Sequence, residues 1–239
     1  MWCNVKDLHD FYHSPQGQMV QRLLSHHIHS IWPSVQGLRL GSYGYPLPYL
    51  KTFYHEAKHL LIMMPAPMGA TPWPYGSLSK VVLCDENNLP LKNKCLDRLL
   101  LVHALEFTEN TRALLREAWR VLSEEGEIMI VVPNRRGLWS CSHTPFGYGQ
   151  PYTGRQLFDL LRNHLFVPQK PTYALYPPPL KRSLSYRLYH QMETMGDRWY
   201  YKMGGVVSIR AQKKILGGIP SETPSWIKRI FIPPRPLDA

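Results

Sequence analysis

The chain has few of the residues that cross-link, anchor or disorder a protein. Its 239 residues include only four cysteines, and none of these forms a Cys-x-x-Cys pair. The longest apolar runs, at residues 59–64 and 98–102, are far shorter than the roughly 20 residues that span a bilayer. Hydrophobic residues still make up 44% of the chain. These features exclude a disulfide scaffold and a disordered chain, and they predict a globular protein with no membrane-spanning helix.

Metal-binding and export motifs are also absent from the sequence. The eleven histidines include no His-Glu-x-x-His or paired Cys/His spacing. The densest group is His26-His27-x-His29, and successive residues of a helix point about 100° apart, so it serves one metal ion poorly. Residues 1–7 lack the basic and then apolar order of a signal peptide. We therefore expect a cytoplasmic protein without a metal site.

Acidic residues are scarce relative to basic ones. The chain has 28 Lys and Arg against 17 Asp and Glu, which gives a net charge of +11. Such a balance permits contact with nucleic acid, but the basic residues are scattered and the densest cluster is only Arg135-Arg136. An RNA-associated protein is therefore an alternative that rests on charge alone.

Apolar runs that alternate with amphipathic segments predict an α/β fold. Ser14-Pro15 is typical of a helix start and predicts a helix over 15–32. Further helices are expected at 47–57, from Asn110 to Leu122 before a turn at Glu124–Gly126, and from Thr153. Strands are expected at 59–64, 80–84, 98–102, 127–132 and 205–212, with weaker ones at 35–40 and 171–176. Because these strands are nearly continuous apolar runs, we expect a mostly parallel sheet covered on both faces.

The pattern divides the chain into three parts. Residues 1–34 form an N-terminal helical extension, 35–212 a single α/β domain, and 213–239 a tail with five prolines from Ile219 onward. In open α/β sheets, ligands bind outside the carboxyl ends of the strands. The segments to examine are therefore 41–46, 64–65, 85–86, 103–106 and 133–152.

The strand ends, taken together, resemble a class I S-adenosylmethionine-dependent methyltransferase of the type 11 family. The resemblance covers about residues 35–165. Phe107 replaces the last residue of the usual Leu-Glu-His after the fourth strand. The matching motifs are the acidic strand end with Leu-Pro at 85–91, the fourth strand at 96–106, the helix and turn at 114–126, and the strand end at 131–134. The resemblance implies a Rossmann-like, seven-stranded, mostly parallel sheet with helices on both faces, and S-adenosylmethionine as the cofactor.

The first motif departs from the family. The usual acidic residue is replaced by Arg39, and the second glycine, Gly44, follows Gly41 by three positions instead of two. Arg39 could still reach the methionine carboxylate of the cofactor. No carboxylate follows the second strand before Asp85, although the family uses one there to bind the ribose. Two functions stay open: a methyltransferase acting on an unidentified acceptor, and a catalytically degenerate module that binds a partner.

The resemblance also implies roles for individual residues. His103 would be the general base, because imidazole titrates near neutral pH, or else a core histidine. Trp73 would stack on adenine or pack its own loop, and Glu106 would orient substrate or cap a turn. The expected cofactor-binding residues are Gly41, Ser42, Tyr43, Gly44, Asp85, Glu86 and His103, and the expected acceptor-binding residues are His143, Tyr148 and Tyr152. A nicotinamide dehydrogenase is excluded, because its glycine fingerprint is missing.

Overall fold

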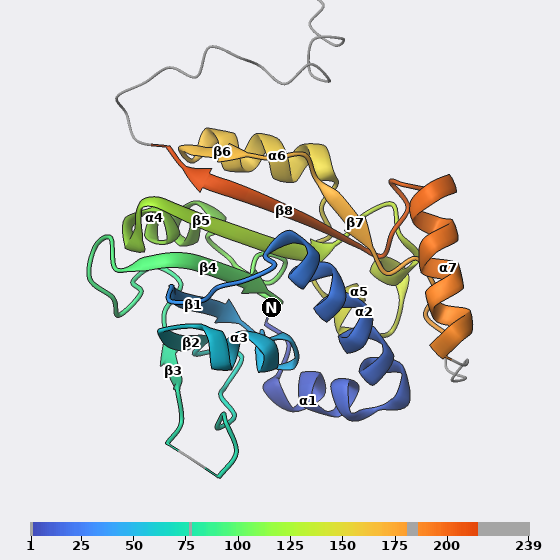
Figure 1. The fold of residues 1–239 in the computed structure, drawn as a ribbon, viewed down its shortest axis with the longest axis horizontal. Helices are drawn as coiled ribbons and strands as arrows, with labels where there is room; N and C mark the ends of the chain where they lie inside the picture. Colours follow the sequence, from blue (N-terminus) through green and yellow to red (C-terminus); the bar gives the residue numbers. More distant parts are fainter. Residues whose placement is uncertain (1, 77, 181–185, 215–239) are drawn as a thin grey trace, which may run out of the picture.

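An eight-stranded mixed sheet forms the centre of the molecule (Figure 1). The computed structural model of the chain describes residues 2–76, 78–180 and 186–214. The strand order is β3-β2-β1-β4-β5-β8-β6, and β7 also pairs with β8. β1 to β5 run parallel, whereas β8 is antiparallel to β5, β6 and β7. The strands are β1 (Arg39–Gly44), β2 (His59–Pro65), β3 (Val81–Cys84), β4 (Leu96–Val102), β5 (Leu122–Pro133), β6 (Phe166–Pro168), β7 (Thr172–Ala174) and β8 (Val206–Lys213).

Helices cover both faces of the sheet, and alternate strand residues divide between two cores. Leu100 and Val102 of β4 pack with α1, α2 and α3, whereas Leu99 and Leu101 pack with α4 and α6. Figure 1 shows α2 and α3 in front of the sheet and α4 behind it. The helices are α1 (Val5–His13), α2 (Pro15–Ile31), η1 (Leu47–Tyr49), α3 (Lys51–Glu56), α4 (Thr111–Val121), η2 (Leu138–Cys141), α5 (Pro145–Tyr148), α6 (Gly154–Asn163) and α7 (Tyr186–Trp199). The mostly parallel α/β sheet with helices on both faces is therefore confirmed.

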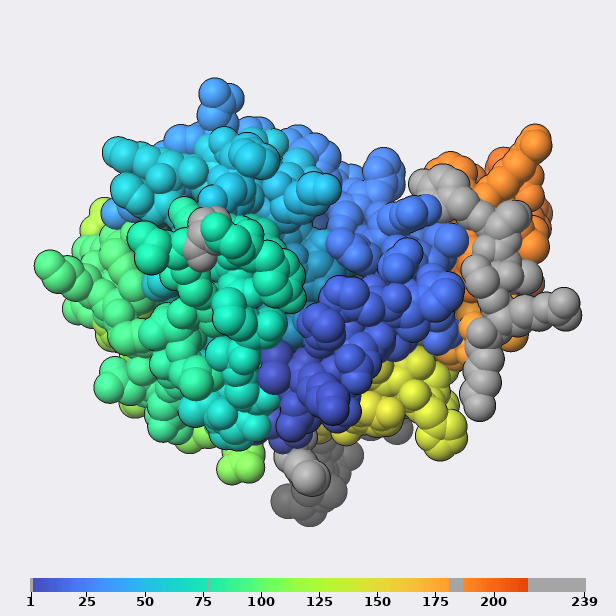
Figure 2. Space-filling view, turned by 90° about the horizontal axis from the view of Figure 1, so that it is seen from below, coloured from blue at the N-terminus to red at the C-terminus, as the bar shows by residue number. Residues whose placement is uncertain are grey.

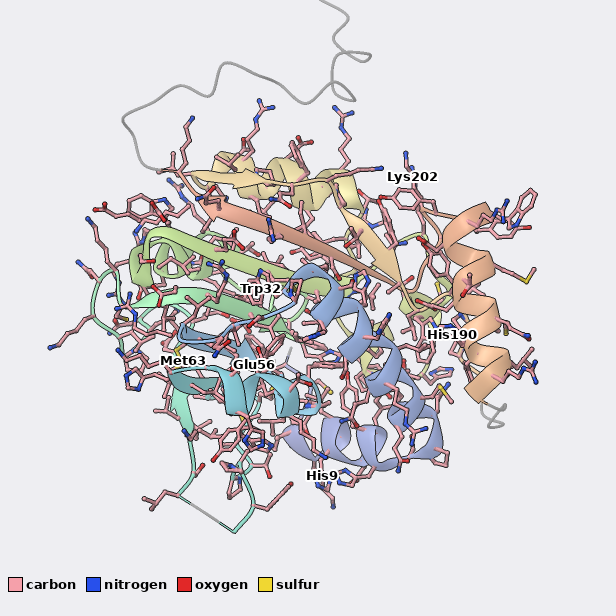
Figure 3. The ribbon with its side chains drawn as sticks, viewed as in Figure 1. His9, Trp32, Glu56, Met63, His190 and Lys202 are labelled. Carbon is pink, nitrogen blue, oxygen red and sulfur yellow. The ribbon has the colours of Figure 1, made fainter. Side chains whose placement is uncertain are left out.

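The helix start at Ser14 is confirmed, and hydrogen bonds fix both ends of α2. The Ser14 hydroxyl accepts a hydrogen bond from the backbone N–H of Gly17 at 3.1 Å, and Pro15 occupies the first helical position. At the other end, the indole of Trp32 donates to the Glu127 carboxylate on β5 at 3.2 Å (Figure 3). The N-terminal segment therefore packs directly on the sheet, and its apolar residues share one core with β1, β2 and β4.

Several elements differ from the sequence-based expectation. The segment 47–57 divides into η1 and α3, and β4 and β5 begin earlier than expected. The expected turn at 124–126 lies inside β5. Leu96 of β4 pairs with Leu122 and Arg98 pairs with Glu127, so the register shifts there and the extra residues of β5 form an irregularity in the strand. Sequence patterns missed α1, β6 and α7. Lys213 closes β8, and the expected tail from 215 onward lies outside the described residues.

Arg39 lies at the amino end of β1 and is not available to a ligand at the carboxyl edge. Its guanidinium donates to both carboxylate oxygens of Asp97 on β4, at 2.9 and 2.7 Å, and its backbone N–H donates to the same group. The expectation that Arg39 reaches the cofactor is therefore wrong. Hydrogen bonds from Arg39 hold the pKa of Asp97 down at about 2.

We expect Asp97→Asn to lower the free energy of unfolding at pH 7 by about 1 kcal/mol, because the pair is partly solvent-exposed and screened. A carboxyl whose pKa is lowered on folding stabilises the protein above its unfolded pKa, and this contribution disappears as the pH falls through the folded value. The difference between wild type and variant should therefore shrink to about half at pH 3. Urea denaturation at pH 7 and pH 3 measures it, with Asp159→Asn of α6, a half-exposed carboxylate 3.6 Å from Arg155, as control. An equal difference at both pH values would contradict this assignment.

Candidate functional site

The carboxyl edge of the sheet turns sharply at Gly44. Its φ is +100°, and a Cβ built there would lie 2.2 Å from the Val102 carbonyl oxygen, so no other residue fits. The next backbone N–H, that of Tyr45, donates to the same carbonyl at 2.7 Å. Tyr43 and Tyr45 consequently enter different cores, on opposite faces of the sheet.

A cavity of about 270 Å³ lies at this edge, beyond the carboxyl ends of β1, β2 and β3. Three carboxylates line it, from Asp85, Glu86 and Glu109, and no Lys, Arg or His does. Its apolar wall includes Trp2, Tyr43 and Pro65. We refer to this space as the acidic cavity. It suits a ligand that carries a positive charge and hydrogen-bond donors.

Asp85 and Glu86 differ in how much of each carboxylate is engaged by the protein. One oxygen of Asp85 accepts hydrogen bonds from the backbone and side-chain amides of Asn87, at 2.8 and 2.7 Å. No described residue donates to its other oxygen. Glu86 is buried and accepts from the Thr108 hydroxyl and, at 2.9 Å, from the Asn110 backbone. Of these two carboxylates, Asp85 is therefore the one available to a ligand, whereas Glu86 fixes the segment before α4.

The hydroxyl of Tyr43 is a buried polar group without a protein partner. The residue is fully buried and lines the acidic cavity, and no described residue accepts from or donates to its oxygen. Burial raises the pKa of Tyr43, so the phenol stays neutral. An unsatisfied buried hydroxyl costs about 1–3 kcal/mol. A polar group bound in this cavity would remove that penalty.

His103 belongs to a buried chain of hydrogen-bonding groups instead of lining the acidic cavity. Its Nε2 lies 2.7 Å from the Tyr12 hydroxyl of α1, which lies 2.5 Å from that of Tyr49. Its Nδ1 lies 3.2 Å from a Glu106 oxygen, an ion-pair distance for the protonated ring. Burial raises the pKa of Tyr12 well above its ordinary value. The Tyr49–Tyr12–His103 chain can pass on a proton, whereas His103 Nδ1 and the facing Glu106 oxygen make no hydrogen bond in the described structure.

The structure brings together only part of the predicted site. Tyr43, Gly44, Asp85 and Glu86 surround the acidic cavity or adjoin it, and His103 lies just beyond β4. Gly41 and Ser42 are buried inside β1, where Ser42 donates to the Leu61 carbonyl at 3.4 Å. Their places between β2 and β4 leave them no access to a ligand in this cavity.

The predicted acceptor residues do not converge on the acidic cavity. His143 and Tyr148 are exposed, and the Tyr148 hydroxyl donates to the His143 carbonyl at 3.3 Å. Tyr152 pairs with Asn134 beyond β5, and its hydroxyl faces the Leu105 carbonyl at 3.5 Å. Trp73 packs edge-on against Tyr54 with ring centroids 5.2 Å apart, so it holds its own loop down.

The sequence reasoning missed the contributions of the N-terminal segment. Trp2 lines the acidic cavity and contacts Tyr43 edge-on, with ring centroids 6.4 Å apart. Val5 donates its backbone N–H to the Met68 carbonyl at 2.9 Å, which fixes α1 against the loop after β2. Figure 2 shows α1 (dark blue) on the surface between that loop (teal) and the segment around α5 (yellow). The sequence of residues 2–13 contains no local pattern that predicts these contacts.

The described residues contain no group of three His, Cys, Asp or Glu side chains that could hold a metal ion. No helix among them is long and apolar enough to cross a membrane.

Comparison with known proteins gives a match to one family model and several similar structures. Residues 45–130 match the model of a methyltransferase domain. No curated protein matches the chain. A Thermotoga maritima S-adenosylmethionine-dependent methyltransferase, described as a possible histamine N-methyltransferase, is similar at 18% identity and TM-score 0.62, over 88% of this chain and 96% of its own. A Haloferax volcanii methyltransferase solved with the Trm112 activator is similar at 14% identity and TM-score 0.57, over 84% and 94% of the two chains.

An Archaeoglobus fulgidus S-adenosylmethionine-dependent methyltransferase is similar at 17% identity and TM-score 0.57, over 81% of this chain and 94% of its own. At such identities the structures show a shared fold, and the sequence match adds the domain at its centre. The resemblance found in the strand-end motifs is confirmed. The chain thus carries a methyltransferase domain within the class I S-adenosylmethionine-dependent methyltransferase fold.

Proposed function

We propose that this protein is an S-adenosylmethionine-dependent methyltransferase that binds the nucleoside part of the cofactor in the acidic cavity. The observation that carries the proposal is the buried, unpartnered hydroxyl of Tyr43 in a cavity that also presents a carboxylate oxygen of Asp85. Adenine offers an amino donor and ribose offers hydroxyl donors. Both donors match the acceptors that this cavity leaves available.

Charge and size also support this placement. The sulfonium of the cofactor is bonded to the ribose, so it would lie next to a cavity lined by three carboxylates and no cationic side chain. Its volume of about 270 Å³ lies just below the range of ligand pockets, which runs from about 300 to 1,000 Å³. Such a volume suits a nucleoside better than the whole cofactor. The methionine end would extend toward the Gly44 turn.

The residues of this chain would act mainly by alignment. The cofactor supplies a methyl group on a good leaving group, so positioning accounts for most of the rate. Tyr43 and Asp85 would hold the nucleoside, and Trp2 would close the cavity over it. His103, whose Nε2 lies 2.7 Å from the Tyr12 hydroxyl, would receive the proton of an acceptor through that hydroxyl.

Asp85→Ala should weaken the binding of S-adenosylhomocysteine about tenfold or more, because a hydrogen bond to a carboxylate is worth about 1.5–3 kcal/mol. Calorimetric titration of the purified full chain measures the dissociation constant. Asp159→Ala, on α6 and outside the residues that line the acidic cavity, is the matched control and should bind as wild type does. Equal affinities for all three proteins would remove Asp85 from the site. If wild-type protein shows no binding at millimolar ligand, the chain is a degenerate binding module and not an enzyme.

Tyr43→Phe separates the binding role of this hydroxyl from a structural role. Removing an unpartnered buried hydroxyl should leave the free energy of unfolding unchanged or raise it by up to about 1 kcal/mol. The same change should weaken S-adenosylhomocysteine binding about fivefold, since the ligand loses a hydrogen bond. Urea denaturation and calorimetry provide the two readouts, with Tyr152→Phe as control. A destabilised variant with unaltered affinity would show that the hydroxyl serves the fold.

A further inference from the structure

One side of α7 is apolar and open to solvent. Leu188, Met192, Met195 and Trp199 follow the spacing i, i+4, i+7, i+11, which places them along one stripe of the helix. Leu188, Met195 and Trp199 are 40%, 63% and 72% exposed. Figure 1 shows α7 at the edge of the molecule, beyond β7. Neither the sheet cores nor the cofactor proposal accounts for this stripe.

A groove of about 360 Å³ adjoins the stripe and extends the apolar surface. Its walls come from α7, η2 and the residues that follow β7 and α7, and none of the described residues that line it is charged. Leu138, Met195, Tyr200 and Met203 line the groove and are each more than half exposed. We call the stripe and these side chains the α7 surface. Contiguous apolar surface of this kind marks an interaction site.

The charges of α7 are divided between its two sides. At about 100° per residue, Arg187 and Arg198 lie about 80° and 60° from Met195 around the helix, so they border the stripe. Glu193 and Asp197 lie about 160° from Met195, and both line a cavity between α2 and α7. Both arginines are exposed, and no described residue forms an ion pair with either. The rim of the stripe is therefore basic.

The end of α7 adds the residue types that favour a membrane interface. Trp199 and Tyr200 are exposed there, and such amphipathic rings are enriched at the depth of lipid headgroups. Figure 3 shows Lys202 close to the same end of the helix, and its side chain is exposed. A protein partner would not require a rim of one charge sign. Anionic headgroups above acyl chains do match a basic rim beside apolar and aromatic side chains.

We propose that the α7 surface binds reversibly to membranes that contain anionic phospholipids. Leu188, Met195 and Trp199 enter the boundary between headgroups and acyl chains, and Arg187 and Arg198 contact lipid phosphates. The strength of such binding depends on the buried apolar area and on attraction to anionic lipid, so both parts of the surface contribute. No residue of the α7 surface lines the acidic cavity, and the proposal is therefore independent of the methyltransferase function.

Binding of the full chain to lipid vesicles tests the inference. Partition coefficients are measured by flotation with vesicles of phosphatidylcholine alone and with vesicles of phosphatidylcholine and phosphatidylglycerol in equal amounts. Met195→Glu places a charge in the stripe, and Leu78→Glu, at a position 94% exposed before β3, is its matched control. Arg198→Gln removes a rim charge, and Arg162→Gln on the exposed face of α6 is its control. Because each pair changes the net charge equally, attraction of the whole basic chain to the vesicles cancels.

We expect the wild-type chain to bind the anionic vesicles about tenfold or more tightly than the neutral ones, and added salt to weaken the binding. Met195→Glu should weaken binding about tenfold and Arg198→Gln about fivefold, whereas each control should change it by less than about twofold. Circular dichroism checks that the variants are folded, as their exposed positions predict.

Three results would each overturn the proposal: no binding to the anionic vesicles, equal binding to both kinds of vesicle, or equal losses in Met195→Glu and Leu78→Glu. Sedimentation of the wild-type chain and of Met195→Glu identifies a competing occupant. A wild-type dimer that dissociates in Met195→Glu, in a chain that binds no vesicles, would assign the α7 surface to a second copy of this chain.

Discussion

The close approach of Gly44 to the Val102 carbonyl is the constraint on which the functional edge of this molecule depends. Only a residue without a side chain fits there, and its positive φ ends β1 directly beside β4. The turn then directs Tyr43 and Tyr45 into different cores, and of the two only Tyr43 lines the acidic cavity.

The N-terminal segment is the second determinant of this edge, because it contacts both the acidic cavity and the end of β4. Trp2 closes the acidic cavity, and Tyr12 contacts His103. A buried hydroxyl or imidazole that loses its partner costs about 1–3 kcal/mol, so the Tyr12–His103 contact favours one position of α1. The functional edge therefore includes residues far outside the segment that matches the methyltransferase domain model.

The sheet was predictable from the sequence because its strands carry their own signal. The runs at 60–65 and 99–102 are continuous and apolar, as a strand covered on both faces requires. α1 gave no comparable signal, since it has only nine residues and buries just two of them, Leu8 and Tyr12. Its role depends on a contact between Tyr12 and His103, which are 91 positions apart. Asp85 and Glu86 were found because they follow a strand, whereas the acidic cavity and the groove beside α7 form only when distant segments fold together.

The departures from the family's first motif are also clearer in three dimensions than in sequence. Arg39, which replaces the usual acidic residue, is paired with Asp97 at the amino edge and stabilises the sheet. The missing ribose carboxylate removes a hydrogen bond worth about 1.5–3 kcal/mol. The Tyr43 hydroxyl would regain about 1–3 kcal/mol when a bound ligand satisfies it, which is a similar amount. Because the Tyr43 side chain is already buried and fixed, ligand binding costs it no further conformational entropy. The Tyr43 hydroxyl can thereby offset the hydrogen bond of the lost carboxylate.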